Sequence, residues 1–121
     1  MPELSKRSTA EVLDDHLRLR AAGNVEDDIE RNYAPDVVVM TARGMKKGHG
    51  AVRAFAEILK EHVPHSYEFP IKLIEGPFAF IEWRAREPGR SVEDGADSFV
   101  IQDGKIVFQS IHYSLQETMP E

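Results

Sequence analysis

Two side chains in this sequence can do acid–base chemistry and are predicted to face the apolar interior, and the first is His16. It follows Val12 by one helical turn and is flanked by Leu13 and Leu17, so the helical period turns its imidazole inward. A histidine can donate a hydrogen bond, or act as an acid or a base, near neutral pH. The alternative is a core histidine that is satisfied by a backbone carbonyl, and the sequence leaves both interpretations open.

The second side chain is Asp97, which shares a strand face with Phe99 and Ile101 through the two-residue period of a strand. A carboxylate on an apolar face is costly unless it is paired or protonated. We therefore predict that Asp97 lies in a pocket, and the alternative is an aspartate at a strand start that reaches solvent. If both side chains face one cavity, they could form a catalytic acid–base pair in which Asp97 fixes the tautomer of His16.

Further residues are candidates for the wall of such a pocket. Tyr33 and Tyr113 could donate hydrogen bonds to a ligand oxygen, whereas core packing is the simpler interpretation for Phe55 and Leu59. Both faces of the strand that carries Trp83 hold bulky residues, so the sequence does not decide which face looks inward. The predicted ligand-binding set is Tyr33, Thr41, Phe55, Leu59, Trp83, Ile111 and Tyr113.

Metal and cofactor motifs are missing from the sequence. His62 and His65 are three positions apart, but Pro64 breaks the helix that would align them, and no third ligand stands nearby. The chain has no cysteine, which excludes thiolate ligands and disulfides. The glycines of residues 44–50 lack the order of a phosphate-binding loop. We predict no metal and no cofactor.

Length and charge limit the remaining classes of function. The 121 residues fit one domain, with an ordered core expected over about residues 5–116. A net charge of −6 argues against nucleic acid as a partner, because nucleic-acid binders present a basic face. No window is apolar enough for a membrane span or a signal peptide, so we expect no membrane partner and a cytoplasmic protein.

Local patterns predict the elements that would position these side chains. Ser8 and Glu11 have the spacing of a capping box at the start of a helix that ends at Gly23. Pro70 suggests a bulge or an edge position in its strand, and Asp103-Gly104 is a strong hairpin signal. The expected order is a helix to Gly23, a helix from Asn24 to Pro35, a strand 37–41, a helix from Ala51, and strands 67–74, 78–86, 95–102 and 105–115. Helices ahead of an antiparallel sheet indicate an α+β domain.

Six short segments together resemble one known family. They are Ala22-Gly23-Asn24, Tyr33 to Val37, Gly48 to Phe55, Ile81 to Ala85, Asp97-Ser98-Phe99 and Asp103 to Ile106. In this order and spacing the chain resembles the SnoaL-like branch of the nuclear transport factor 2-like superfamily, which includes polyketide cyclases and ketosteroid isomerases. The resemblance implies a cone-shaped, mainly antiparallel sheet wrapped on three helices, a pocket inside the cone, and a homodimer through the outer sheet face.

The resemblance also implies roles for three residues. His16 takes the place of the oxyanion-hole tyrosine of ketosteroid isomerases, and Asp97 takes the place of their protonated aspartate. Thr41 stands where those enzymes carry their basic aspartate, which argues against the standard steroid isomerase mechanism. The arginine and paired aspartates of limonene epoxide hydrolases are not evident either.

Three functions follow as alternatives. The first is a cyclase- or isomerase-type enzyme that transfers a proton on a small hydrophobic carbonyl compound. The second is a non-catalytic binding protein for a small hydrophobic ligand, and the third is an assembly domain. Fold-level resemblance alone does not choose among them.

Overall fold

The computed structural model describes residues 4–63 and 66–117, which form three α-helices and one seven-stranded sheet. In chain order the elements are a 3-10 turn Leu4–Lys6, α1 (Thr9–Ala21), α2 (Val25–Asn32), β1 (Tyr33–Thr41), β2 (Gly44–Lys47), α3 (His49–His62), β3 (Tyr67–Glu75), β4 (Phe78–Glu87), β5 (Arg90–Gln102), β6 (Lys105–His112) and β7 (Leu115–Glu117). None of the helices in these two ranges is long and apolar enough to cross a membrane.

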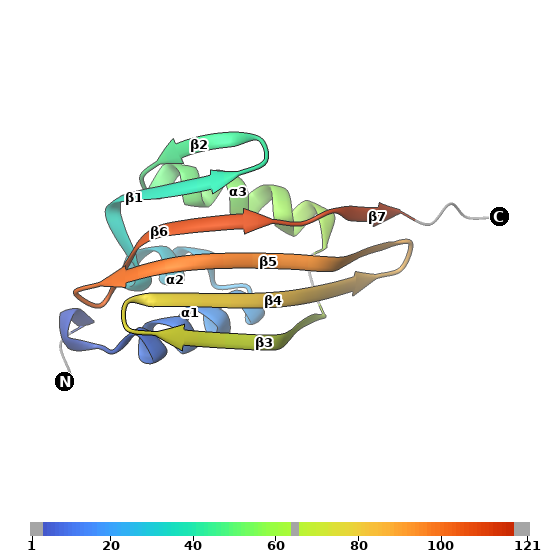
Figure 1. Ribbon diagram of the computed structural model, residues 1–121. Helices are drawn as coiled ribbons and strands as arrows, with labels where there is room; N and C mark the ends of the chain where they lie inside the picture. The colour runs from blue at the N-terminus through green and yellow to red at the C-terminus, as the bar shows by residue number, and fades with distance from the viewer. Residues whose placement is uncertain (1–3, 64–65, 118–121) are drawn as a thin grey trace.

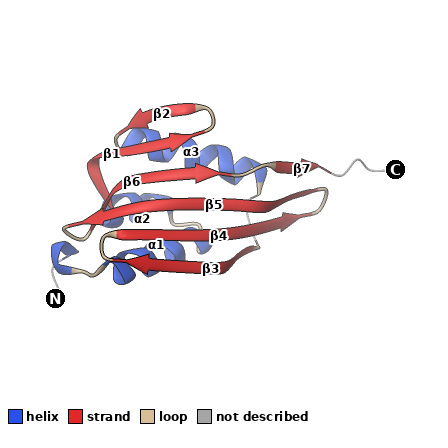
Figure 2. Ribbon diagram, viewed as in Figure 1, coloured by secondary structure: helices blue, strands red, loops and turns tan. Residues whose placement is uncertain are grey.

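The strands lie in the order β2-β1-β6-β5-β4-β3, with β7 paired to β5. β1 and β6 run parallel, and the other neighbouring pairs are antiparallel. All three α-helices cover the same face of the sheet (Figures 1 and 2). The predicted α+β class is confirmed, with a large curved sheet that stays open because β2 and β3 form two free edges.

The local signals in the sequence explain several of these elements. Ser8 accepts a hydrogen bond from the Glu11 amide, and the Glu11 carboxylate accepts one from the Ser8 amide, so the predicted capping box starts α1. Pro70 lies in edge strand β3, where the register against β4 shifts between Glu68 and Ile71. Both positions foreseen for this proline, the edge and the bulge, are therefore confirmed.

The strand expected over residues 105–115 is divided into β6 and β7, and three element starts differ from the prediction. β1 begins at Tyr33 rather than at Val37, because Tyr33 already pairs with Ile106 of β6 in an extended conformation. α3 begins at His49, just after Gly48, whose positive φ of 91° turns the chain into the helix. β5 begins at Arg90, because residues 90–92 pair with both β4 and β7. Pro64 was expected to break the third helix, and His65 was considered as a metal ligand; both lie outside the described residues.

The core lies between the helices and the inner face of the sheet. Its members come from every layer and include the fully buried Leu13, Ile29 and Val37, and the nearly inaccessible Phe99. His16 and Asp97 are buried in the same region, with 3% and 8% of their surfaces exposed. The inward orientation that the sequence patterns predicted for both is therefore confirmed.

The outer face of the sheet and its β3–β4 end carry apolar side chains. Leu73 and Phe78 are 61% and 58% exposed, and a shallow hollow beside them also includes Phe80 and Phe108. The homodimer expected through this face stays a prediction.

Candidate functional site

A cavity of about 240 Å³ lies between α1, α3 and the inner face of the sheet. Most of the predicted site residues line it, namely His16, Thr41, Phe55, Leu59, Trp83, Asp97, Ile111 and Tyr113. Tyr33 is the exception, because it is packed behind the wall with 1% of its surface exposed, and its hydroxyl donates a hydrogen bond to Gln109. The prediction that Tyr33 contacts a ligand in the cavity is therefore wrong, because its side chain does not line the cavity.

His16 is held at the cavity wall by a carboxylate that the sequence analysis did not propose. Its Nδ1 lies 2.8 Å from Oδ2 of Asp28 on α2. The rings of Tyr33 and Phe99 contact the imidazole edge-on, with centroids at 5.7 and 5.4 Å. Because an ionised carboxylate only accepts hydrogen bonds, Nδ1 carries the proton and Nε2 is the basic nitrogen of the ring.

Asp28 is completely buried and accepts three hydrogen bonds. Besides His16, Nε of Arg20 lies 2.6 Å from Oδ2, and Nδ2 of Asn32 lies 2.8 Å from Oδ1. Burial works to raise the pKa of Asp28, but the electrostatic interactions and hydrogen bonds with His16 and Arg20 outweigh it and lower that pKa. The carboxylate therefore stays ionised beside His16.

The sequence did not reveal this role of Asp28. Three acidic residues open α2, and we interpreted them as first-turn acids favoured by the helix dipole. In the structure Asp28 lies on the buried face of α2 with Ile29 and Asn32, whereas Asp27 points to solvent. The helical period, which places residues 28 and 32 one turn apart, was the only available signal.

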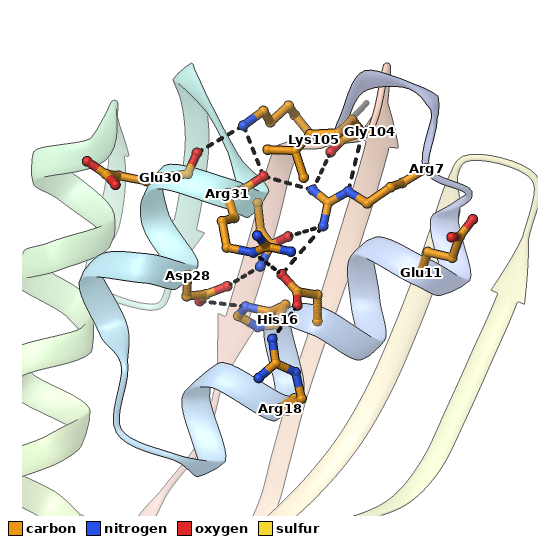
Figure 3. A network of polar contacts seen from close by, with 12 residues as sticks. Arg7, Glu11, His16, Arg18, Asp28, Glu30, Arg31, Gly104 and Lys105 are labelled. Atoms are coloured by element: carbon orange, nitrogen blue, oxygen red, sulfur yellow. Dashed lines mark hydrogen bonds and ion pairs between the residues drawn. The ribbon is translucent and has the colours of Figure 1, made fainter. Parts of the chain in front are cut away.

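Polar contacts continue from Asp28 to the surface of the protein (Figure 3). Asn32 accepts a hydrogen bond from Arg7 at 2.9 Å, and Arg7 also donates to the carbonyls of Arg31 and Gly104 at 2.8 and 3.0 Å. The 3-10 turn packs directly against Gly104, because a Cβ at Gly104 would lie 1.9 Å from the Leu4 carbonyl oxygen. The N-terminal segment thus holds Asn32, and through it Asp28, in a fixed orientation.

Arg20, on the last turn of α1, brings a positive charge to the cavity wall. Its guanidinium is bound to Asp28, and Asp97 lies in the same cavity. The sequence analysis did not propose this ion pair between Arg20 and Asp28. Arg20 and Asp28 lie on the consecutive helices α1 and α2, whereas Asp97 lies on β5, far along the chain.

Asp97 has a different set of partners. The indole Nε1 of Trp83 donates to Oδ1 at 3.0 Å, and the amide Nε2 of Gln109 donates to Oδ2 at 2.9 Å. Burial raises the pKa of Asp97, and these two neutral donors offset only part of that effect. The environment favours the protonated carboxyl, which can itself donate a hydrogen bond into the cavity.

Gln109 was missed in the sequence although the two-residue period could have found it. It lies on the strand face that continues to Ile111 and Tyr113, and only 3% of its surface is exposed. The Tyr33 hydroxyl donates to its Oε1, which turns its Nε2 toward Asp97. Tyr33 therefore acts behind the wall as an orienting residue.

His16 and Asp97 do not form the hydrogen-bonded pair that the sequence suggested. The imidazole is oriented by Asp28, whereas Asp97 is held by Trp83 and Gln109. Both side chains nevertheless line one cavity, so a ligand can contact both. The predicted partner of His16 was therefore wrong, whereas the predicted position of His16 and Asp97 at one cavity was right.

Trp83 faces the cavity, which answers the question that the sequence left open. Its ring lies between Tyr67 and Tyr113, with centroids at 5.8 and 5.5 Å, and its flat side covers Gly95. A Cβ at Gly95 would lie 2.3 Å from the indole, so only glycine permits this approach. Glu82 and Arg84 consequently lie on the exposed face of β4.

The opening of the cavity is more polar than its apolar walls. There His62 lies 3.0 Å from the Tyr113 hydroxyl, and Arg43 and Lys60 are exposed at the edge. Within residues 4–63 and 66–117, no three His, Asp or Glu side chains are grouped so that they could hold a metal ion.

The sequence profile of the SnoaL-like domain matches residues 13–109, which is most of the chain. The chain belongs to the SnoaL-like family. This match confirms the resemblance drawn from short segments, and it includes β1 to β5 and most of α1 and β6. Comparison with curated proteins gives no match.

The solved structures that resemble this chain include proteins described with different functions. A nuclear transport factor 2-like protein from Burkholderia xenovorans is 18% identical, with a TM-score of 0.70 over 93% of this chain and 86% of that one. A protein from Sinorhizobium meliloti, proposed to be a polyketide cyclase, is 21% identical, with a TM-score of 0.70 over 84% and 93%. SalBIII, an epoxide hydrolase/cyclase-like enzyme in pyran ring formation in salinomycin, is 13% identical, with a TM-score of 0.74 over 91% and 95%. At these identities the similarity establishes the fold alone.

Proposed function

We propose that this SnoaL-like protein is an acid–base enzyme that moves a proton on a small hydrophobic carbonyl compound, in an isomerase- or cyclase-type reaction. The observation that carries the proposal is a pair of buried carboxyls with pKa shifts in opposite directions at one apolar cavity: Asp97 lies on its wall, and Asp28 lies behind His16, which also lines it. Environments that separate two such groups are typical of catalytic acids and bases.

In this mechanism His16 is the general base. Its Nε2 removes a proton from the carbon next to the substrate carbonyl, while Nδ1–H stays hydrogen-bonded to Asp28. The imidazolium that forms is stabilised by the ionised Asp28 carboxylate at 2.8 Å. Asp28 is a positioning residue, because it acts through His16.

Asp97 is the acid of the pair. In its protonated form it donates a hydrogen bond to the substrate carbonyl oxygen, and it stabilises the negative charge that develops there as the carbon loses its proton. Trp83 and Gln109 occupy one acceptor position on each carboxyl oxygen, which leaves a position for the proton to point into the cavity. The enolate then takes the proton back from the imidazolium at another carbon, or it attacks a second carbonyl and closes a ring, and the alkoxide that forms takes the proton from the imidazolium.

The size of the cavity limits the substrate. An apolar cavity of about 150 Å³ accommodates benzene, and the cavity here measures about 240 Å³. A compound of one or two rings fits this space. Phe55, Leu59 and Ile111 would contact the apolar part of the compound.

Exchange of carbon-bound hydrogen for deuterium tests the proposal without knowledge of the natural substrate. The protein is incubated in D₂O with one- and two-ring ketones such as acetophenone, cyclohexenone and 2-tetralone, and loss of the proton next to the carbonyl is followed by NMR. We expect catalysed exchange, which His16→Gln and Asp97→Asn each reduce by about 10²-fold or more. Asp27→Asn, which changes the exposed neighbour of Asp28, is the matched control and should exchange at the wild-type rate.

The same experiment decides against the proposal if folded wild type binds ketones but exchanges no proton. That result would identify a non-catalytic binding protein. One observation favours this second candidate: Thr41 lines the cavity, and its hydroxyl already accepts a hydrogen bond from the Arg43 amide at 3.0 Å, so no carboxylate base stands at this position.

A further inference from the structure

The charges around the cavity are opposite in sign to the charge of the chain. The sequence has 21 acidic and 15 basic residues. Among the described residues, the lining includes the cations Arg20, Arg43 and Lys60, but Asp97 is its only carboxyl group. Because burial favours the neutral form of Asp97, this carboxyl does little to balance those cations.

The three cations differ in whether their charge is already neutralised. Arg20 is bound to Asp28 at 2.6 Å inside the protein. In residues 4–63 and 66–117, Arg43 and Lys60 form no ion pair, and both are exposed. At the same edge the Asp94 carboxylate accepts a hydrogen bond from the Ser114 amide at 2.8 Å, and His112 lies 3.9 Å from it.

The two unpaired cations come from separate elements that meet at one end of the molecule. Arg43 is in the turn that joins β1 to β2, and Lys60 is in the last turn of α3. In Figure 1 that turn and the C-terminal end of α3 both lie toward the end of the sheet where β7 is found. Arg43 is also close enough to Tyr113 to lower the pKa of its hydroxyl, although burial of Tyr113 raises that pKa more.

We infer that the ligand of this cavity is a hydrophobic carboxylic acid, whose carboxylate lies at the opening between Arg43 and Lys60. The apolar body then extends past Leu59 and Trp83 toward His16 and Asp97. Under the proposed function, on which this inference rests, the substrate is a keto acid with its carbonyl at the inner end and its carboxylate at the outer end.

The chemistry of the opening suits a carboxylate. The guanidinium of Arg43 can donate two parallel hydrogen bonds to it, and the ammonium of Lys60 adds a second positive charge. The Tyr113 hydroxyl lies 3.0 Å from Nδ1 of His62 and belongs to the same edge, and its own proton can point to a carboxylate when Nδ1–H of His62 donates to its oxygen. A carboxylate bound here keeps its outer side in water, so its desolvation cost stays small.

Binding of acids and their esters tests the inference. The probes are aryl and cycloalkyl keto acids, beginning with 4-acetylbenzoate, in which the ring separates the carboxylate from the carbonyl, each with its methyl ester, its primary amide and the corresponding phosphonate. Dissociation constants are measured by calorimetry for wild type, for Arg43→Gln/Lys60→Gln, and for the control Arg84→Gln/Lys47→Gln. The control removes one arginine and one lysine that are exposed outside the cavity lining, so it changes the net charge equally.

We expect wild type to bind the acids about tenfold more tightly than the esters and amides, since two exposed ion pairs supply a modest gain. The preference should fall to about twofold in Arg43→Gln/Lys60→Gln, persist in the control, and weaken as the salt concentration rises. The inference is overturned if no acid binds more tightly than its ester, or if the preference survives in the Arg43→Gln/Lys60→Gln variant. A phosphonate that binds more tightly than every carboxylate also contradicts it.

This outcome is separate from that of the proposed function. Proton exchange on the neutral esters and on acetophenone tests the chemistry at His16 and Asp97 without any anion. Acid preference without exchange would therefore reject the enzyme and keep the carboxylate site, whereas exchange without acid preference would do the reverse.

Discussion

Asp28 and Asp97 are two buried carboxyl groups beside the same cavity, and their surroundings differ in one respect. Asp28 accepts hydrogen bonds from His16 and the guanidinium of Arg20, whereas Asp97 accepts them only from an indole and an amide. Both groups are almost inaccessible to water. Burial acts on the pKa of both groups in the same direction, so their opposite shifts agree with the difference between a charged donor at Asp28 and neutral donors at Asp97.

The largest effect should come from removing the ionised member of this comparison. Asp28→Asn leaves the Arg20 guanidinium, whose side chain is 20% exposed, without its counter-charge, and we expect a loss of about 3 kcal/mol in the free energy of unfolding. Urea unfolding followed by circular dichroism measures it. Asp27→Asn, on the exposed face of the same helix, should change stability little; equal values for the two variants would show that the charge of Asp28 is not needed.

A smaller loss of stability is expected when a substitution displaces Trp83, which donates a hydrogen bond to Asp97. Gly95→Ala places a methyl group 2.3 Å from the Trp83 ring, which must shift away from Asp97, at a cost of about 1–3 kcal/mol. Trp83 is the only tryptophan of the chain, so its fluorescence reports the shift directly.

Gly50→Ala is the control for this substitution. A Cβ at Gly50 meets no atom within 4 Å, and the residue lies within α3, so alanine there should keep or increase stability. An unchanged emission spectrum and an unchanged stability for Gly95→Ala would mean that the close approach of the indole is not maintained in solution.

The smallest and most specific effect is the dependence of stability on pH. The pKa of Asp97 is raised in the folded protein, so its contribution to stability is complete below about pH 3.9, the value for the unfolded chain, and is lost as pH rises through the folded pKa. The pKa of Asp28 is lowered, so its contribution is present above about pH 3.9 and is lost as pH falls through the folded value.

Unfolding of wild type and Asp97→Asn from pH 3 to pH 8 measures the first contribution. The stability of wild type relative to Asp97→Asn should decrease as pH rises, with a slope that approaches about 1.4 kcal/mol per pH unit within the titration window. A difference that increases with pH would show that Asp97 is ionised in the folded protein, and it would remove the acid from the proposed mechanism.

Sequence patterns were most informative where a single element determines the outcome. The capping box at Ser8, the inward position of His16 and the edge position of Pro70 all follow from local periodicity or local backbone chemistry. The cavity face of β5 at Asp97 was predictable in the same way, since the two-residue period of a strand placed it with Phe99.

The pairings between elements were not predictable. The partner of His16 lies on another helix, and the helical period that separates Asp28 from its exposed neighbour Asp27 does not reveal that Asp28 contacts His16. Tyr33 was placed at the ligand because a tyrosine can donate a hydrogen bond, but its position at the junction of α2 and β1 turns it behind Gln109. Both errors arise because the sequence shows the chemistry of each side chain but not the distances between side chains on different elements.

The hydrogen bond from Arg7 to the carbonyl of Gly104 joins residues 97 positions apart. During synthesis on a ribosome, α1 and α2 emerge long before the β5–β6 turn that contains Gly104, so the brace behind Asn32 forms only when the chain is nearly complete. Contacts of such long range slow folding, because a long loop must close before they can form. A partly made chain can therefore contain His16 and Asp28 in helices, but the outer support that fixes their orientation arrives with the last strands.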